Sequence, residues 1–172
     1  MKVIIETERL YLCEVDAARD FDRWAEAMAD EDTMRYLGGK TMNRPLAWRN
    51  MATVTGHHQL RGYSFMSVIG KESGKWLGRV GPWNPEGWPE PEIGWTLHPD
   101  SHGHGYATEA AQASVDYVFD TLGWKRTIHI IVDGNEASMR VAERVGSKRT
   151  GEINEIPGIY EGHCWIYSQE RL

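Results

Sequence analysis

The sequence has little of what marks the specialised classes of protein. It contains only two cysteines in 172 residues, Cys13 and Cys164, too few for a disulfide framework or a four-thiolate zinc site. No apolar run approaches the ~18 residues of a membrane helix. The first residues hold only three apolar side chains before charge resumes, so they do not form a signal peptide. We therefore expect a soluble, cytoplasmic protein with no membrane partner.

An excess of positive charge is also missing. Lysine and arginine number 19 against 25 aspartate and glutamate, which gives a formal net charge of −6. A general nucleic-acid binder normally has a basic excess, so we expect no nucleic-acid partner. The hydrophobic share of 41% and the charged share of 26% are ordinary for a globular protein. With no internal repeat or low-complexity linker, the chain is predicted to form one domain over residues 1–172.

Hydrophobic periodicity predicts alternating strands and helices. Proline, glycine and two tryptophans mark residues 81–91 as a loop. The predicted helices span residues 16–28, 45–60, 106–122 and 136–145. The predicted strands span residues 10–15, 63–69, 76–80, 92–98, 127–132 and, more weakly, 147–153 and 163–168. This order implies an α/β (α+β) fold with one mixed sheet and helices on its faces.

The most informative segment runs from Glu92 to Ala111 and reads EIGWTLHPDSHGHGYATEAA. A strand meets a Pro-Asp-Ser break, two glycines follow, and a helix is predicted to begin at about Tyr106. The glycines let the backbone approach a ligand, and the free N–H groups of the first helical turn point at it. The segment therefore predicts a site for a phosphate-bearing ligand, although a tight Gly-x-Gly turn without a ligand has the same local sequence.

The nucleotide-binding motifs do not fit this segment. A Walker A loop requires G-x-x-x-x-G-K-[ST], which is absent from the sequence. A dinucleotide fingerprint requires a third glycine or alanine where Thr108 stands, and it normally lies near the start of a β-α-β unit.

Four motifs together resemble a known acyl-CoA signature. They are TERLYL at 7–12, EIGWTL at 92–97, GHGYATEA at 103–110 and NEASMRVAERVG at 135–146. In order and spacing they resemble the GNAT superfamily of N-acetyltransferases, and within it the RimJ/RimL-like branch typified by ribosomal-protein N-terminal acetyltransferases. The resemblance covers nearly the whole chain. It implies about seven mostly antiparallel strands, four helices, central strands splayed to admit CoA, and acetyl-CoA as co-substrate.

The resemblance also implies which residues bind acetyl-CoA. The backbone of Leu97 and His98 would pair with the pantetheine amides, and Asn135, Ser138 and Arg140 would contact CoA from the second helix. His102 stands where the superfamily often has glutamine or arginine, but this position mainly supplies backbone. The pyrophosphate would bind the amides of a continuous run, which comprises His102, Gly103, His104, Gly105, Tyr106, Ala107 and Thr108.

Two residues are candidates for catalysis. The family comparison makes Glu92 a general base, acting directly or through a water, because a desolvated carboxylate can accept a proton from an ammonium. Many members carry a tyrosine acid where this chain has Ala142, so we assign Ser138 to hydrogen-bond the leaving thiolate. Each residue also has a purely structural alternative. Glu92 could be a surface or salt-bridged side chain, Asn135 could only cap its helix, and Ser138 could only be a small residue that lets CoA approach.

Further side chains have functional and ordinary interpretations. Trp83 and Trp88 lie among prolines and glycines and would line a cleft for the acceptor. Arg140 and Arg144, one helical turn apart, would meet the ribose phosphate of CoA or only solvent. A cluster of three histidines and one aspartate suggests a metal site; its members are His98, Asp100, His102 and His104. Alternate residues of a tight turn rarely converge on one point, so we expect no bound metal.

The sequence thus predicts an N-acetyltransferase that moves the acetyl group of acetyl-CoA to a primary amine. Attack would be direct, in a ternary complex without an acyl-enzyme, because Cys13 and Cys164 lie outside the matching motifs. The branch suggests a protein N-terminus as acceptor, while polyamines, amino acids and amine antibiotics stay open. The alternative is a non-catalytic acyl-CoA-binding sensor, which the missing tyrosine keeps open. A monomer and a homodimer are both compatible with the sequence.

Overall fold

A computed structural model describes residues 1–156 and 160–171. Within them eight strands form one sheet, where the sequence predicts about seven. The strands are β1 (Val3–Glu6), β2 (Leu10–Cys13), β3 (Met66–Gly70), β4 (Trp76–Trp83), β5 (Glu92–Leu97), β6 (Arg126–Val132), β7 (Lys148–Ile156) and β8 (Tyr160–Glu170).

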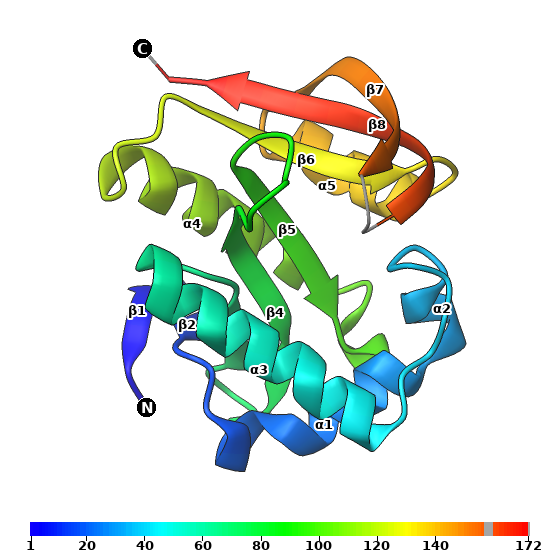
Figure 1. Cartoon of the computed structure of the whole chain (residues 1–172). Helices are drawn as coiled ribbons and strands as arrows, with labels where there is room; N and C mark the ends of the chain where they lie inside the picture. The colour runs from blue at the N-terminus through cyan, green and yellow to red at the C-terminus, as the bar shows by residue number, and fades with distance from the viewer. Residues whose placement is uncertain (157–159, 172) are drawn as a thin grey trace.

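The sheet is mixed, as predicted. Its spatial order is β1-β2-β3-β4-β5-β6-β8-β7, and every neighbouring pair is antiparallel except β5 and β6. The additional strand is β1, which is only four residues long and pairs with β2 at one edge of the sheet (Figure 1). So short a segment shows no clear alternation, and its pairing partner defines it as a strand.

The helices cover both faces of the sheet. The structure has five α-helices in the described residues, where the sequence predicts four, and the additional one is α2. The helices are α1 (Ala17–Ala29), α2 (Glu31–Met34), α3 (Arg44–Arg61), a short 3₁₀ turn η1 (Pro99–Ser101), α4 (Tyr106–Asp120) and α5 (Glu136–Arg144). Helix α2 is a single turn capped by Asp30, too short to show a helical period. Helices α1 and α3 lie in front of the sheet in Figure 1, and α4 and α5 lie behind it.

Each face of the sheet buries its own apolar cluster. Trp24 and Met28 of α1 and Val54 of α3 pack with Trp76 on one face, and all four are buried. On the other face the apolar side of α4 packs against inward-facing residues of β2 to β5. The predicted stripe of α4 is therefore the side that the sheet covers.

Strand β4 is longer than the sequence predicts. Residues 81–83 were expected in a loop, but they continue β4 and pair with β5 as far as Trp83↔Glu92. The last pair of β4 with β3 is Met66↔Val80, so Pro82 lies where β4 pairs with β5 alone among the described strands and its missing N–H breaks no bond to β3. Strand β4 is also bent. Its register with β3 shifts between Val68↔Gly78 and Ile69↔Trp76, which leaves Leu77 as the extra residue of a β-bulge.

The parallel strands β5 and β6 separate soon after they meet. Their register contains the single pair Glu92↔Ile128, so the two strands diverge from this point. Beyond it, the backbone N–H of Ile130 donates to the Glu92 carboxylate instead of to a β5 carbonyl, at 2.9 Å. The buried His129 ring bonds the Ile93 carbonyl oxygen at 2.7 Å through Nδ1. The splay expected of the central strands thus opens beside Glu92.

None of the helices in the described residues is long and apolar enough to cross a membrane.

Candidate active site

A cavity of about 540 Å³ lies where β5 and β6 diverge. Its walls come from the end of β5, the loop after η1, the first turn of α4, the first turns of α5, and the segment after α2. Every motif in the Glu92–Ala111 segment except the first part of β5 thus contributes to one space. Its volume falls within the usual range for small-molecule sites.

The N-terminus of α4 offers its backbone N–H groups to this cavity. Gly105 is the N-cap and has φ 78°, a left-handed conformation that favours glycine, and no side chain caps the helix. The other four α-helices are each capped by an aspartate or asparagine side chain. The uncapped first-turn amides of Tyr106, Ala107 and Thr108 line the cavity and carry the positive end of the helix dipole. This arrangement suits a phosphate group.

The N-terminal TERL motif holds this loop in place. The Arg9 guanidinium bonds the Glu109 carboxylate of α4 at 2.7 Å and donates to the His104 carbonyl oxygen at 2.9 Å. The Thr7 hydroxyl also bonds Glu109, at 2.6 Å, and Arg9 lies over the Tyr106 ring at 4.8 Å. These contacts lower the pKa of Glu109 despite partial burial. The sequence motif was recognised as typical, but the structure supplies its physical role.

Replacing Arg9 with alanine is expected to weaken acetyl-CoA binding about tenfold. The substitution removes two charge-assisted contacts to one Glu109 oxygen and the bond to the loop carbonyl. Ordering the loop would then consume part of the binding energy of acetyl-CoA. Isothermal titration calorimetry with acetyl-CoA measures the change. Lys2→Ala is the control, because it removes another cation that pairs with a glutamate, Glu14, in a more exposed contact outside both cavities. Equal affinities for wild type and Arg9→Ala would contradict the clamp.

Most residues predicted to bind CoA line the first cavity. The predicted residues that line it are Leu97, His102, Gly103, Gly105, Tyr106, Ala107, Thr108, Asn135, Ser138 and Arg140. The structure does not bring His98 and His104 to the cavity wall. The His98 backbone N–H donates to the Leu77 carbonyl oxygen at 2.8 Å, and its carbonyl oxygen accepts from Ser101 at 2.8 Å. Both backbone groups of His98 thus have a partner within the protein, and its pairing with pantetheine stays a prediction.

The first cavity is basic although the whole chain is acidic. Arg35, Arg140 and Arg144 line it, against the single acidic residue Asp32. Arg35 is the partner of Asp32, at 2.6 Å, so the arginines of α5 contribute most of the excess positive charge. Their position beside the α4 N-terminus favours an anionic ligand.

Ser138 lies in the first cavity and is held by Trp95. The Trp95 indole Nε1–H donates to the Ser138 hydroxyl at 3.1 Å, which leaves the hydroxyl hydrogen available to another acceptor. Asn135 caps α5 by accepting from the Ser138 N–H at 3.2 Å, so its structural role is present. Ala142 is fully buried in a cluster with Met139 and lines neither cavity.

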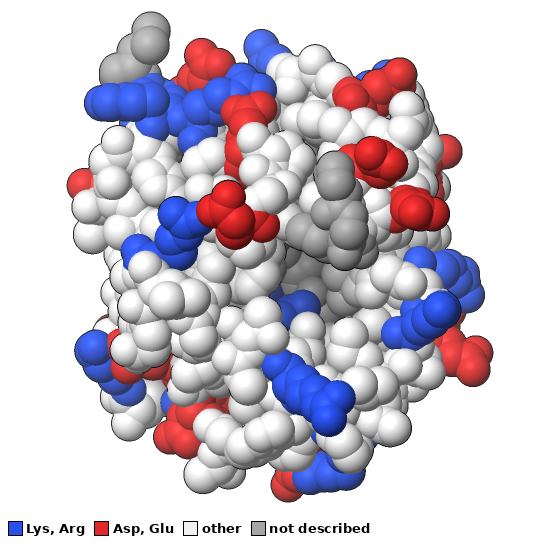
Figure 2. Space-filling model, viewed as in Figure 1, with Lys and Arg blue, Asp and Glu red and all other residues white. Residues whose placement is uncertain are grey.

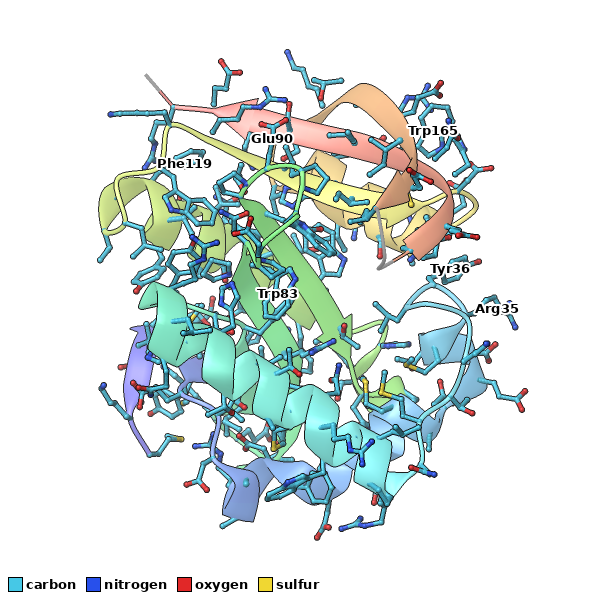
Figure 3. The ribbon with its side chains drawn as sticks, viewed as in Figure 1. Arg35, Tyr36, Trp83, Glu90, Phe119 and Trp165 are labelled. Atoms are coloured by element: carbon cyan, nitrogen blue, oxygen red, sulfur yellow. The ribbon has the colours of Figure 1, made fainter. Side chains whose placement is uncertain are left out.

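A second cavity of about 340 Å³ adjoins the first. Both are lined by Tyr36 and Leu37 from the segment after α2 and by Trp95 and Thr96 of β5. Figure 2 shows the hollow near the middle of the molecule, and Figure 3 shows Tyr36 across this space from Trp83. The Tyr36 hydroxyl donates to the Gly134 carbonyl oxygen at 3.2 Å and so spans the open end of the splayed strands. Two ligands, one in each cavity, would therefore come into contact at these four shared residues.

Glu92 lies in the second cavity, not on the surface. Its side chain is buried, with one oxygen accepting from the Trp88 indole at 2.7 Å and the other from the Ile130 backbone N–H at 2.9 Å. Burial raises the pKa of Glu92 to about 7, while these two hydrogen bonds oppose the shift. It forms no ion pair with the residues that the structure describes. A carboxyl group with this pKa exchanges protons readily at neutral pH.

The second cavity also contains the two tryptophans singled out in the sequence. Trp83 stacks on the His57 ring at 4.4 Å between centroids, and Trp88 bonds Glu92. Cys164 lines the same cavity, closer to the site than its place outside the motifs implied. Burial raises the pKa of its thiol, which keeps it protonated and a poor nucleophile.

Several residues of the site were beyond sequence reasoning. Tyr36 and Leu37 belong to an irregular segment whose only signal is the pair of glycines after it. Arg79 is buried on β4, where a strand reading gives no reason for a charge. Among the described residues, no three His, Cys, Asp or Glu side chains converge to hold a metal ion.

Comparison with known proteins agrees with this geometry. The sequence profile of the family described as "Acetyltransferase (GNAT) domain" matches residues 9–148. The chain belongs to the GNAT family of acetyltransferases. This GNAT protein is 34% identical over 140 residues to the uncharacterized protein YkkB of Bacillus subtilis (strain 168), covering 77% of the chain and 79% of YkkB.

Solved structures share the fold of this acetyltransferase. The GNAT-family acetyltransferase of Bacillus anthracis superposes with a TM-score of 0.82 at 26% identity, covering 99% of this chain and 98% of that one. The Microcin C7 self immunity acetyltransferase MccE, solved in complex with acetyl-CoA and AMP, superposes with a TM-score of 0.78 at 16% identity, covering 96% and 94%. At that identity MccE shows a shared fold. The protein is accordingly an acyltransferase with acetyl-CoA as its partner.

Proposed function

We propose that this GNAT protein transfers the acetyl group of acetyl-CoA to a primary amine by direct attack in a ternary complex. We take residues 1–172 as one catalytic domain of the RimJ/RimL-like branch, on the motifs at 92–97, 103–110 and 135–146. The observation that carries the proposal is Glu92, a buried carboxyl group with a pKa of about 7 in a cavity that adjoins the CoA cavity.

In the proposed reaction, the first cavity holds CoA and the second holds the acceptor. The pyrophosphate lies on the amides at the α4 N-terminus, and pantetheine follows the free edge of β5 at Leu97. The acetyl group then lies at the residues that the two cavities share. Holding both substrates in line at this junction supplies much of the acceleration.

Glu92 acts as general base in this scheme. It takes a proton from the acceptor ammonium, directly or through a water, so that the neutral amine attacks the thioester carbonyl carbon. The new C–N bond forms, the C–S bond breaks, and the CoA thiolate leaves and is protonated. The two fixed N–H donors of Trp88 and Ile130 keep the Glu92 carboxyl group oriented toward the cavity.

Because the proposed reaction has no acyl-enzyme, Cys164 is not expected to act as a nucleophile. Since burial keeps its thiol protonated, iodoacetamide is expected to leave the initial rate of CoA release unchanged while the protein stays folded. The assay follows free CoA thiol from acetyl-CoA with a panel of primary amines. Acetyl-CoA binding without thiol release for any amine would overturn the proposed function.

Ser138→Ala is expected to lower kcat about 10- to 100-fold with little change in the KM for acetyl-CoA. The hydroxyl donates to the departing thiolate, and a hydrogen bond to a charged group contributes about 1.5–3 kcal/mol. It is also the only hydroxyl that α5 presents to the first cavity. Steady-state kinetics at saturating amine measures the change.

Tyr36→Phe is the matched comparison for Ser138→Ala. It removes a hydroxyl group at the junction of the cavities, one that donates to the Gly134 carbonyl oxygen. We expect a smaller loss of kcat in this variant. An unchanged kcat in Ser138→Ala together with a large loss in Tyr36→Phe would transfer the role to Tyr36.

A further inference from the structure

One side chain of the second cavity has no part in the chemistry described so far. Arg79, on β4, is only 8% exposed, and its guanidinium lies between the rings of Trp24 and Phe65 at 4.9 and 4.8 Å. Its Nη1 donates to Asn50 Oδ1 at 3.3 Å, an oxygen that also accepts from the Trp24 indole. Its Nε is buried and has no hydrogen-bond partner in the described part of the chain.

The charge of Arg79 is therefore not neutralised by the protein residues described. Burial lowers the pKa of Arg79 to about 10, so the side chain is still a cation at neutral pH. A buried cation without a counter-charge is costly, and two aromatic faces with one amide oxygen offset only part of that cost. An uncharged side chain of similar length would fill the same space without the cost. The arrangement calls for an anion.

The anion would have to come from the cavity. Of the described residues that line it, Arg79 is the only lysine or arginine and Glu92 the only acid. Figure 2 shows basic atoms at the bottom of the central hollow. The cavity thus presents one group that takes up a proton from an amine and one that attracts an anion.

The two charged residues lie on one face of the sheet, separated along β5. Arg79 pairs with Thr96 and Trp83 pairs with Glu92, so the two positions lie on neighbouring strands and are four residues apart, about 13 Å along the strand direction. Gly94 lies between them, and a Cβ added there would come within 2.9 Å of the Phe65 ring. The glycine therefore allows the Phe65 ring to approach β5 at this position.

We propose that the acceptor is a small zwitterionic amine, whose amino group faces Glu92 and whose carboxylate or phosphate-type group pairs with the Arg79 guanidinium. This specificity rests on the proposed function. The planar fork of arginine matches both kinds of anion with two parallel hydrogen bonds. A cavity of about 340 Å³ holds a small molecule. A polyamine would place a second cation beside Arg79 and is excluded.

The test compares amines that differ only in their anionic group. The series runs from glycine to 6-aminohexanoate, with the amide of each acid as its neutral partner, and aminoalkylphosphonates of the same lengths distinguish carboxylate from phosphate-type recognition. At the best chain length we expect kcat/KM for the anionic amine to exceed that for its amide by at least about 30-fold, as expected for a buried charge pair. Equal turnover of acid and amide would overturn the specificity while leaving the acetyltransferase function intact.

Two variants locate the effect at Arg79. Arg79→Met keeps the apolar packing between the two rings and is expected to abolish the preference for the anionic amine. Arg79→Lys keeps the charge without the fork and is expected to retain part of it. Thermal melting and acetyl-CoA binding establish that each variant is folded. A preference that survives in folded Arg79→Met would contradict the proposal.

A binding measurement separates failure of this proposal from failure of the acetyltransferase function. If no amine is acetylated, calorimetry with the CoA-bound protein and 4-aminobutyrate still tests the site. Binding to wild type that is lost with 4-aminobutanamide and in Arg79→Met would support the anion site without turnover. No heat for any member of the anionic series would overturn it.

Discussion

Replacing Glu92 with glutamine is expected to lower kcat by about 10²- to 10⁴-fold, the range of a general base. Glutamine has nearly the same shape and its amide oxygen can still accept from one of the two donors, Trp88 or Ile130. It cannot take a proton from the acceptor ammonium. Because Glu92 lies outside the CoA cavity, the affinity for acetyl-CoA is expected to stay close to that of wild type. Steady-state kinetics and acetyl-CoA titration together measure this separation.

The pH profile gives a second signature of the same residue. Burial raises the pKa of Glu92 to about 7, so the carboxyl group is mostly protonated below pH 7 and ionised above it. Only the ionised form accepts a proton, so kcat/KM is expected to fall about tenfold per pH unit below 7 from this group. Glu92→Gln should lose that limb, while the ionisation of the acceptor amine contributes equally in both proteins.

The matched control is Glu90→Gln. Glu90 is two residues away and chemically identical, but it lines neither cavity and its carboxylate pairs with Arg126 at 2.7 Å. Figure 3 shows Glu90 near the start of β5, away from the space between Tyr36 and Trp83. We expect its kcat to stay within about twofold of wild type. Equal losses in the two variants, or an unchanged acidic limb in Glu92→Gln, would remove Glu92 from the role of base.

The acetyl-CoA side of the site was largely predictable because it is local in sequence. Gly103, Gly105 and the first turn of α4 form one continuous segment, and the backbone geometry they require is written in their residue types. Asn135 and Ser138 share another short motif. Because these signals are local, the motif match names residues that the structure brings to one cavity.

The acceptor side was hardly predictable because distant segments form it. Arg79 becomes a buried cation only when α1 supplies the Trp24 ring and the residue before β3 supplies the Phe65 ring. Tyr36 reaches the site because its segment crosses to Gly134 over the splayed strands. The backbone partners of His98 depend on a related feature, since the register of β5 against β4 decides which backbone groups stay free. No periodicity in the sequence records these relations.

Gly78→Ala is expected to lower the free energy of unfolding by about 2 to 6 kcal/mol, the combined range of overpacking and backbone strain. Gly78 follows the β-bulge of β4, with φ 156°. A Cβ there would lie 2.4 Å from the Thr96 carbonyl oxygen and 2.7 Å from the Leu97 Cα atom. Both are backbone atoms of β5, so no side-chain rotation relieves the contact, and β4 and β5 must move apart. Denaturant unfolding monitored by tryptophan fluorescence measures the change.

Gly56→Ala is the matched control and is expected to have the opposite sign. Gly56 lies inside α3, and a Cβ there meets no atom within 4 Å. Alanine loses less conformational freedom than glycine on entering a helix, so the protein should gain about 0.5–1 kcal/mol. Destabilisation by both variants would mean that any added methyl group perturbs the fold. Destabilisation by Gly78→Ala alone would show that close approach of β4 to β5 requires this glycine. The same approach positions Leu97 in the wall of the first cavity and Thr96 where the two cavities meet.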